Sequence, residues 1–262
     1  MEKISIITAT YNRPDLLKRM IVSVLEQTMT KWELIIVDDS TNDDTETFIQ
    51  KYKDNPRIIY LKNKQNEGLP FSRNRGLESA TGVWVTFLDD DDFYKAESTL
   101  HTLCDYLKES VLPWCAFNKV FPDGNPVTNI LIEKASYNWT TDFLFGHAIQ
   151  GDHIPFFKKE LIGALRYHGK QRSEWQFWYE LSQKTNFNHW PVDAVVAEYL
   201  PDGMSNLGYL KKERVYQGQQ FRKMVRRTAT WKYLPIIAKR YVASFVPIRK
   251  LINRLRHKQT AH

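Results

Sequence analysis

VWVTFLDDDDF, residues 83–93, joins an apolar run directly to four consecutive aspartates. The β-branched and aromatic residues before the acids predict a short buried strand. We therefore expect the acids at the carboxyl end of a core strand, the edge of an open α/β sheet where ligands bind. Their clustered oxygens suit a hard divalent cation, Mg²⁺ or Mn²⁺, which would bring phosphate oxygens with it. A solvated acidic turn capping the next helix is the alternative, and the run by itself leaves both open.

The rest of the first 95 residues alternates strands with helices. Strands are expected at residues 3–9, 32–37, 57–61 and 83–88, and helices from Pro14, Asp43 and Leu69 onward. This alternation predicts an α/β fold with a mostly parallel central sheet flanked by helices. The second half is more mixed, with strands expected at residues 114–121, 154–157 and 192–200 and a helix over 174–182.

Composition is that of an ordinary globular protein. The 262 residues, 42% hydrophobic and 26% charged, are enough for one large or two modest domains. No apolar run approaches the roughly 20 residues that a membrane-spanning helix needs, and the N-terminus lacks a cleavable signal pattern. Cys104 and Cys115 have no metal-ligand spacing and form no disulfide framework. A reducing, cytoplasmic setting is expected.

Charge is distributed very unevenly along the chain. Residues 209–262 carry 15 Lys and Arg against the single acid Glu213, a net charge of +14. Because the whole chain has a net charge of +7, residues 1–208 have a net charge of −7. Basic residues alternate with apolar and aromatic ones there, which predicts a basic amphipathic helical region. We expect residues 211–258 to bind an anionic membrane surface. No nucleic-acid partner is expected, since no recognised motif accompanies the basic region; helices packed on the rest of the chain remain the other interpretation.

Polar groups follow each of the expected parallel strands. They are the segments TYNRP at residues 10–14, DDS at 38–40, NEGLPFSRNRG at 66–76 and the acids at 89–92. In a parallel sheet these strand ends share one edge. That edge would then offer an aromatic face for a base, an isolated acid, an arginine and a metal-binding acid cluster, a set that would bind a nucleoside diphosphate.

These segments resemble those of family 2 glycosyltransferases, which have the GT-A fold with its Rossmann-like sheet. The matching pieces are residues 5–13, 33–40, 66–68, 72–76 and 82–92, in the order and spacing of the family. The resemblance implies a GT-A domain over residues 1–208, with a nucleotide-sugar-binding half (1–95) and an acceptor-binding half (96–208). Residues 209–262 would form a separate basic C-terminal region.

The resemblance also implies roles for individual residues. The donor nucleotide would be bound by Thr8, Ala9, Tyr11, Asp38, Asp39, Arg73, Asp89 and Asp90, with Tyr11 against the base and Asp39 bonded to it. Asp91 and Asp89 would bind Mn²⁺ or Mg²⁺. The structural alternatives are a helix-entry role for Tyr11, capping or sheet-edge roles for Asp38 and Asp92, and a solvated Arg75.

On the acceptor side, the family's Glu-Asp pair is replaced by Ser173 and Glu174. The resemblance implies that Glu174 is the catalytic base, which takes the proton of the acceptor hydroxyl. An acid capped at the start of a helix is the structural alternative. His147, His153 and Trp175 are further acceptor-side candidates.

The sequence is compatible with three functions. The first is an inverting, metal-dependent transferase that moves a sugar from a UDP-sugar to a growing cell-surface or lipid-linked glycan, at the inner face of the cytoplasmic membrane. The second is a catalytically weak nucleotide-sugar-binding or scaffold protein of a membrane complex. The third, a nucleotidyltransferase, is disfavoured because the segment after the first strand is not a glycine-rich phosphate loop.

Overall fold

The computed structural model describes residues 1–144, 148–169 and 174–198, all within one compact unit. The first half contains β1 (Ile4–Thr10), α1 (Pro14–Leu25), β2 (Trp32–Asp38), α2 (Asp44–Ile49), η1 (Gln50–Tyr52), β3 (Ile58–Lys62), α3 (Leu69–Ser79), β4 (Trp84–Phe87) and β5 (Phe93–Tyr94). The second half contains α4 (Thr99–Glu109), β6 (Trp114–Val120), β7 (Asn129–Ile130), η2 (Trp139–Leu144), β8 (Ile149–Gln150), β9 (His153–Lys158), α5 (Lys159–Ile162), α6 (Glu174–Ser182) and β10 (Asn188–Val196). The predicted basic region at residues 209–262 lies outside the described residues.

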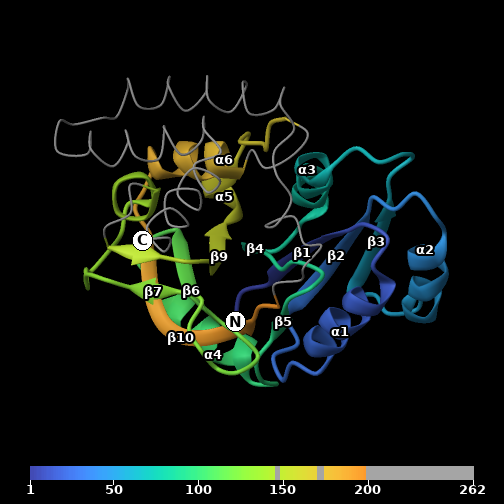
Figure 1. Cartoon of the computed structure of the whole chain (residues 1–262), viewed down its shortest axis with the longest axis horizontal. Coiled ribbons are helices and arrows are strands. Elements are labelled where there is room, and N and C mark those ends of the chain that lie inside the picture. Colours follow the sequence, from blue (N-terminus) through green and yellow to red (C-terminus); the bar gives the residue numbers. More distant parts are fainter. Residues whose placement is uncertain (145–147, 170–173, 199–262) are drawn as a thin grey trace, which may run out of the picture. The chain divides into compact units, whose positions relative to one another are not determined.

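One mixed sheet runs through the described part of the chain (Figure 1). Its strand order is β3-β2-β1-β4-β9-β6-β10-β5. The strands β3, β2, β1 and β4 are parallel to one another, whereas β9 pairs antiparallel with both β4 and β6. The parallel half therefore places four strand ends at one edge, as predicted, and β9 joins it to the second half.

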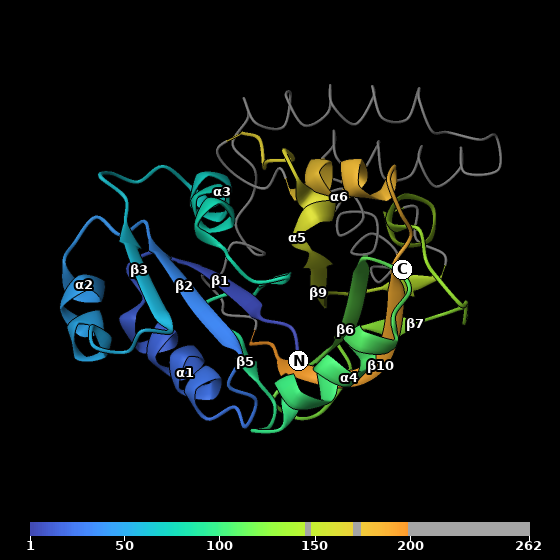
Figure 2. The same ribbon diagram turned by 180° about the vertical axis from the view of Figure 1, so that it is seen from behind.

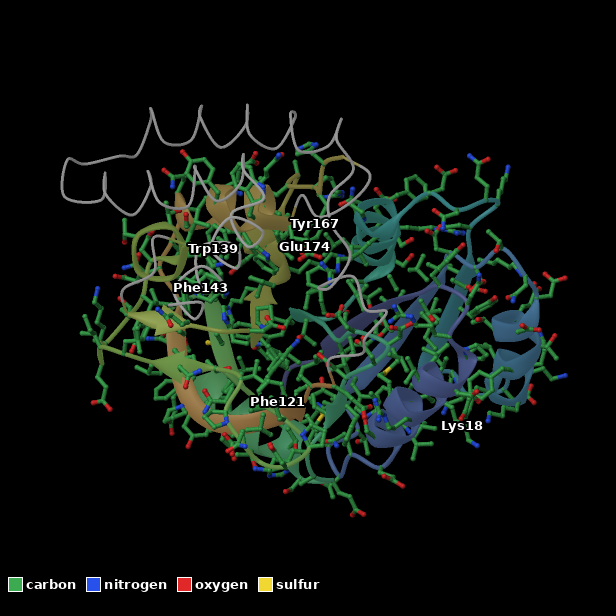
Figure 3. The ribbon with its side chains drawn as sticks, viewed as in Figure 1. Lys18, Phe121, Trp139, Phe143, Tyr167 and Glu174 are labelled. Atoms are coloured by element: carbon green, nitrogen blue, oxygen red, sulfur yellow. The ribbon has the colours of Figure 1, made fainter. Side chains whose placement is uncertain are left out.

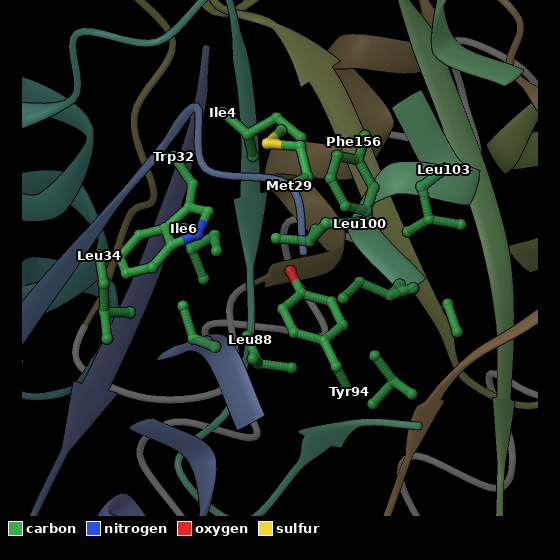
Figure 4. Close-up of a cluster of buried hydrophobic side chains, with 14 of the residues drawn as sticks. Ile4, Ile6, Met29, Trp32, Leu34, Leu88, Tyr94, Leu100, Leu103 and Phe156 are labelled. Atoms are coloured by element: carbon green, nitrogen blue, oxygen red, sulfur yellow. The ribbon is translucent and has the colours of Figure 1, made fainter. Parts of the chain in front are cut away.

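Helices cover both faces of the sheet. Figures 1 and 2 show α1 and α4 on one side and α3 and α6 on the other. The first face is closed by a core of apolar side chains from α1, α4 and the strands. Figure 4 shows part of it, including Leu88, the residue directly before the acid run, which is 1% exposed. Burial of Leu88 anchors the start of the acidic turn.

The second face holds an aromatic core. Trp114 is fully buried and contacts Phe157, Trp178 and Phe187, with ring centroids between 4.9 and 6.1 Å apart. Such contacts add to the free energy gained from burying apolar area. This core packs α6 against the sheet and so fixes the position of its first residue, Glu174.

Two local features direct the chain at the strand ends. Asn12 has a φ of 53°, a left-handed conformation that asparagine tolerates, and it turns the chain from β1 into α1. Gly76 lets α3 approach β1 closely, because a Cβ at this position would overlap the side chain of Ile7. Both features bring polar loops close to the strand ends.

The sequence-based predictions fail in places in the second half. The strand expected at residues 192–200 is instead β10, which begins at Asn188 and ends at Val196. Pro191 interrupts its pairing with β6, where the register shifts between Trp190 and Asp193, because proline has no N–H to donate. The helix α4 was not predicted.

Within the described ranges, no helix has both the length and the apolar character needed to cross a bilayer.

Candidate functional site

The carboxyl ends of β1, β2 and β4 lie side by side. Thr10 pairs with Asp38 across β1 and β2, and the Thr8 hydroxyl donates to the Leu88 carbonyl oxygen at 2.8 Å. The polar segments that follow these strands are therefore neighbours, as parallel topology requires. We call this edge the rim; it comprises residues 10–13, 38–40 and 89–92.

The four consecutive aspartates at residues 89–92 have different partners. Their contacts are Asp89 with Arg73 Nη2 at 2.8 Å, Asp90 with Thr10 Oγ1 at 2.7 Å and Arg13 Nη1 at 3.4 Å, Asp91 with Arg13 Nη1 at 3.4 Å, and Asp92 with Lys119 Nζ at 2.7 Å. The side chains of Asp89 and Asp91 are 45% and 21% exposed, whereas Asp90 and Asp92 are buried. The structure thus divides the run into two buried acids and two that reach solvent.

Asp90 and Asp91 ionise less readily than an ordinary aspartate. Burial raises the pKa of the Asp90 carboxyl to about 6, and the Thr10 hydrogen bond and the Arg13 charge offset only part of this effect. Burial, followed by the negative charges of Asp89 and Asp90, likewise raises the pKa of Asp91 to about 6. A cation bound beside these carboxylates would relieve the repulsion between them.

Asp92 belongs to a separate buried network. Lys119 of β6 donates to Asp92 and to Asp152, each at 2.7 Å, and its own side chain is 6% exposed. Although burial opposes it, the charges of Asp152 and Asp92 raise the pKa of Lys119 above its ordinary value. Asp92 is therefore held by a fixed internal cation, and it joins the acidic turn to the second half of the sheet.

Arg73 connects the rim to α6. Its guanidinium donates to Asp89 at 2.8 Å through Nη2 and to Glu174 through Nη1. The side chain is 8% exposed and lies over the rings of Phe87 and Tyr167, at 5.5 and 5.6 Å. Figure 3 labels Glu174 and Tyr167, the two residues that Arg73 contacts near α6. Residues 101 positions apart in sequence, Arg73 and Glu174, thus form one charged group with Asp89.

Asp39 organises the loop before α3. Its Oδ1 accepts from Asn63 Nδ2 at 2.7 Å and from the Glu67 N–H at 2.8 Å, and its Oδ2 accepts from the Gly68 N–H at 2.8 Å. Gly68 has a φ of 91°, which most side chains would not tolerate. Tyr11, by contrast, is 45% exposed at the rim. Contacts of Asp39 and Tyr11 with a donor base stay predictions.

The other predicted donor residues lie within the sheet. Asp38 is fully buried, and its two oxygens accept from the Ser40 N–H at 2.9 Å and the Tyr60 hydroxyl at 2.6 Å. Thr8 is also fully buried, whereas Ala9 is partly exposed. The buried contacts of Asp38 and Thr8 therefore stabilise the backbone at the ends of β2 and β1, the kind of structural role weighed for Asp38 above.

The acceptor-side candidates are dispersed. The His153 ring lies in the aromatic core, 5.1 Å from the Phe143 ring and 5.7 Å from that of Phe187, and burial lowers its pKa to about 4. Trp175 follows Glu174 on α6 and is partly buried. His147 lies outside the described residues. Their roles in acceptor binding stay predictions.

The rim offers oxygen ligands but no closed metal cage. Among the described residues, no three His, Cys, Asp or Glu side chains converge on one point. Carboxylate oxygens of Asp89 and Asp91, both partly exposed, are the ligand type that Mg²⁺ and Mn²⁺ prefer. Mg²⁺ is commonly held by one or two carboxylates together with phosphate and water oxygens, so this donor set fits such an ion.

Comparison with known proteins identifies the family. The sequence profile described as glycosyl transferase family 2 matches residues 5–158, more than half of the chain. The chain belongs to glycosyl transferase family 2. It is 33% identical over 224 residues to the GalNAc(5)-diNAcBac-PP-undecaprenol beta-1,3-glucosyltransferase of Campylobacter jejuni, covering 83% of this chain and 72% of the relative. It is 30% identical over 201 residues to the putative teichuronic acid biosynthesis glycosyltransferase TuaG of Bacillus subtilis, covering 75% and 78%.

Solved structures confirm the fold of this family 2 member. Staphylococcus aureus TarS 1–349, solved in complex with UDP-GlcNAc, matches with a TM-score of 0.72 at 16% identity, over 90% of this chain and 71% of that one. Across the TarS structures the chain spans 43–71% of the solved chain. The predicted GT-A fold is therefore confirmed.

Sequence reasoning missed two basic residues of the site. Arg13 was noted only within the segment after β1, and Lys119 was not singled out at all. A lysine in the otherwise apolar run WCAFNKVF is a usable signal, because a charge within a buried strand needs a partner. No sequence signal would have identified Asp92 and Asp152 as its partners, since they come from separate loops.

Proposed function

We propose that this family 2 member is an inverting, metal-dependent glycosyltransferase. It moves a sugar from a UDP-sugar to a growing cell-surface glycan, and the acceptor is lipid-linked. One observation carries the proposal: the guanidinium of Arg73 pairs with Asp89 of the rim and with Glu174 of α6. A donor-side acid and the expected base therefore lie within reach of one buried side chain, as a transfer between two bound substrates requires.

Each residue of the site has its own role in the proposed reaction. Glu174 accepts the proton of the acceptor hydroxyl while the hydroxyl oxygen attacks the anomeric carbon. The bond from that carbon to the diphosphate oxygen breaks in the same step, and this single in-line displacement inverts the anomeric centre. Arg73 orients the Glu174 carboxylate. Asp91 and Asp89 would hold Mn²⁺ or Mg²⁺, which when bound would offset the negative charge that develops on the leaving diphosphate.

Donor specificity in the proposal rests on the nucleotide side of the rim. Tyr11 is exposed and free to lie against a uracil ring, and Asp39 shapes the adjoining loop. The UDP-GlcNAc complex of TarS supports a UDP-sugar as donor. The name of the Campylobacter relative, which contains PP-undecaprenol, supports a polyprenyl-diphosphate acceptor.

The proposed location in the cell is argued from the charge of the C-terminal region. The region 209–262 carries 15 Lys and Arg against one acid, and each basic residue near an anionic bilayer contributes roughly 1 kcal/mol to binding. We propose that residues 211–258 hold the enzyme at the inner face of the cytoplasmic membrane, where a polyprenyl-linked acceptor would be presented.

A donor panel tests the proposal. The full chain is incubated with UDP-, GDP- and dTDP-sugars, each with Mn²⁺, Mg²⁺ or EDTA, and release of the nucleoside diphosphate is measured. We expect release from one UDP-sugar that is lost in EDTA. Release from a GDP- or dTDP-sugar alone would contradict the UDP assignment, and undiminished release in EDTA would contradict the metal requirement.

A pair of variants on α6 tests the base. Glu174→Gln should lower transfer by at least about 10²-fold while UDP affinity, measured by calorimetry, stays unchanged. Glu180→Gln, the same substitution on the same helix, should leave both unchanged. Wild-type transfer in Glu174→Gln would remove Glu174 from the role of base. UDP binding by the wild type without turnover of any donor, even with lipid-linked acceptors present, would favour the binding-protein alternative.

A further inference from the structure

Arg13 contacts both Asp90 and Asp91, the two middle residues of the acid run at 89–92. Its Nη1 lies 3.4 Å from Oδ1 of Asp90 and 3.4 Å from Oδ2 of Asp91. The other basic contacts of the acid run are shorter, 2.8 Å for Arg73 with Asp89 and 2.7 Å for Lys119 with Asp92. Charge-assisted hydrogen bonds are usually about 2.7–2.9 Å long. Arg13 therefore neutralises its two acids through loose contacts.

The setting of Arg13 favours movement of its side chain. The side chain is 26% exposed, whereas those of Arg73 and Lys119 are 8% and 6% exposed. Its backbone is fixed at the start of α1, where the Arg13 carbonyl oxygen accepts from the Leu17 N–H at 3.1 Å. Water can therefore replace the carboxylate contacts of the guanidinium at little cost, while the helix keeps the residue at the rim.

A divalent cation would use one of the two acids that Arg13 contacts, because Asp91 is a proposed metal ligand and Arg13 lies against its Oδ2. A cation bound through Asp91 must break or weaken the ion pair at Oδ2, since a guanidinium and a metal ion repel each other at such short range. Arg73 and Lys119 do not contact Asp91, and Arg73 contacts the other proposed ligand, Asp89, through Oδ1. Of these three basic side chains, Arg13 is the one whose contacts compete directly with a metal at Asp91.

We propose that Arg13 competes with the divalent cation for Asp91 and passes to the diphosphate when cation and donor bind. This inference rests on the proposed function, because it assumes that Asp91 is a metal ligand. Arg13 then acts as a positioning residue. It balances the charge of the acid pair before the donor binds, and afterwards it presents a planar guanidinium, which matches phosphate geometry, to the diphosphate beside the cation.

Two binding constants should therefore change in opposite directions in Arg13→Gln. Affinity for Mn²⁺ alone, followed by the electron paramagnetic resonance signal of free Mn²⁺, should rise roughly tenfold, the low end of the value of a close charge pair. Affinity for UDP at saturating Mn²⁺ should fall by a similar factor, because a charge-assisted phosphate contact is lost. A residue that merely supports the fold would weaken both.

Three further variants of the full chain complete the test. Lys18→Gln removes one positive charge from the exposed side of α1 (Figure 3) and should change neither constant. Arg13→Lys keeps the charge without the planar fork and should lie between wild type and Arg13→Gln, so it decides the question if Arg13→Gln unfolds. Asp91→Asn should lose Mn²⁺ binding.

Each outcome has a separate meaning. Unchanged or weaker Mn²⁺ binding in Arg13→Gln, or equal tightening in Lys18→Gln, would overturn the competition. Tighter Mn²⁺ binding with unchanged UDP affinity would overturn the transfer of Arg13 to the diphosphate. Wild-type Mn²⁺ binding in Asp91→Asn would overturn the proposed metal site itself, and the Arg13 inference with it. Loss of binding in Asp91→Asn beside unchanged binding in Arg13→Gln would overturn the Arg13 inference alone.

Discussion

Acids at the two ends of the same parallel strands have opposite environments. At the amino end, Glu33 of β2 accepts hydrogen bonds from Lys3 at 2.5 Å, Ser5 at 2.6 Å and Thr81 at 2.6 Å. Burial works against ionisation there, but these donors lower its pKa to about 2. At the carboxyl end, burial and neighbouring charges raise the pKa of Asp90 and Asp91 to about 6.

The difference separates an acid whose charge is satisfied within the fold from acids whose charge is only partly offset there. Every hydrogen bond to Glu33 favours its charged form, so the residue ties β1, β2 and the start of β4 together. Asp90 and Asp91 accept too few hydrogen bonds to offset the cost of burying their charges, so their ionised forms destabilise the fold. Raised carboxyl pKa values of this kind are common at functional sites. The stability supplied by Glu33 is present above pH 4.5 and lost as the pH falls toward 2. The contribution of Asp90 and Asp91 to stability has the opposite pH dependence, because it is lost as the pH rises through about 6.

The largest expected effect is on the function of the rim. Asp91→Asn should reduce sugar transfer by about 10³-fold, since a metal ligand supplies several kcal/mol of transition-state stabilisation. Its melting temperature should stay equal to that of the wild type or rise, because one repelling charge is gone. Asp54→Asn, an exposed change in the turn before β3, is the control for both measurements. Near-normal transfer together with a lower melting temperature would make Asp91 a structural acid like Glu33.

A smaller functional effect is expected for the link between the rim and α6. Arg73→Lys should lower kcat/KM by about 10²-fold, because a single ammonium cannot reproduce the two directed contacts with Asp89 and Glu174. Arg75→Lys, on the same helix, should cost less than about threefold, since Arg75 donates to the Lys62 carbonyl oxygen and to Asn63. Steady-state kinetics on both variants checks the contrast, and equal losses would remove the special role of Arg73.

At the amino end the effect should be on stability alone. Glu33→Gln should lower the free energy of unfolding by about 2 kcal/mol, because the Lys3 and Ser5 contacts lose a charged acceptor. Activity of the folded enzyme should not change. Glu46→Gln, which breaks an exposed pair with Lys62, should cost under about 0.5 kcal/mol. Urea unfolding measures both. A change in KM for the donor in Glu33→Gln would show that the two ends of the sheet are not independent.

The smallest effect is a difference between two pH profiles. The folded pKa of Asp91, about 6, is above its ordinary value of 3.8, so its stabilising contribution is complete below pH 3.8 and lost as the pH rises through 6. The pKa values of His153 and His189 are lowered by burial to about 4, so these residues make stability increase with pH. The wild type and Asp91→Asn both retain them, and their effect cancels in the comparison. In EDTA, Asp91→Asn should gain about 1 kcal/mol over the wild type between pH 4 and 7. Parallel urea-unfolding profiles would contradict the raised pKa.

The parallel half of the fold was predictable because its signals are local. The strands β1 to β4 follow from hydrophobic periodicity and polar strand ends, and each agrees with the structure. In the second half, the helix over 174–182 agrees as well. The short strands β5, β7 and β8 were missed, since two residues are too few to show a period. The strand predicted to begin at Val192 begins at Asn188 instead, and its register with β6 shifts around Pro191, which a bulge accommodates.

The sequence by itself determined the family, the alternation of strands and helices, and the position of an acid run at the end of a buried strand. These depend on residues close together in the chain, whose spacing carries the information. Only the tertiary structure decided which cation each acid meets: Arg13 from the end of β1, Arg73 from α3 and Lys119 from β6. Electrostatic interaction depends on distance in space and on burial, and four adjacent aspartates identical in sequence therefore become four chemically different groups in the fold.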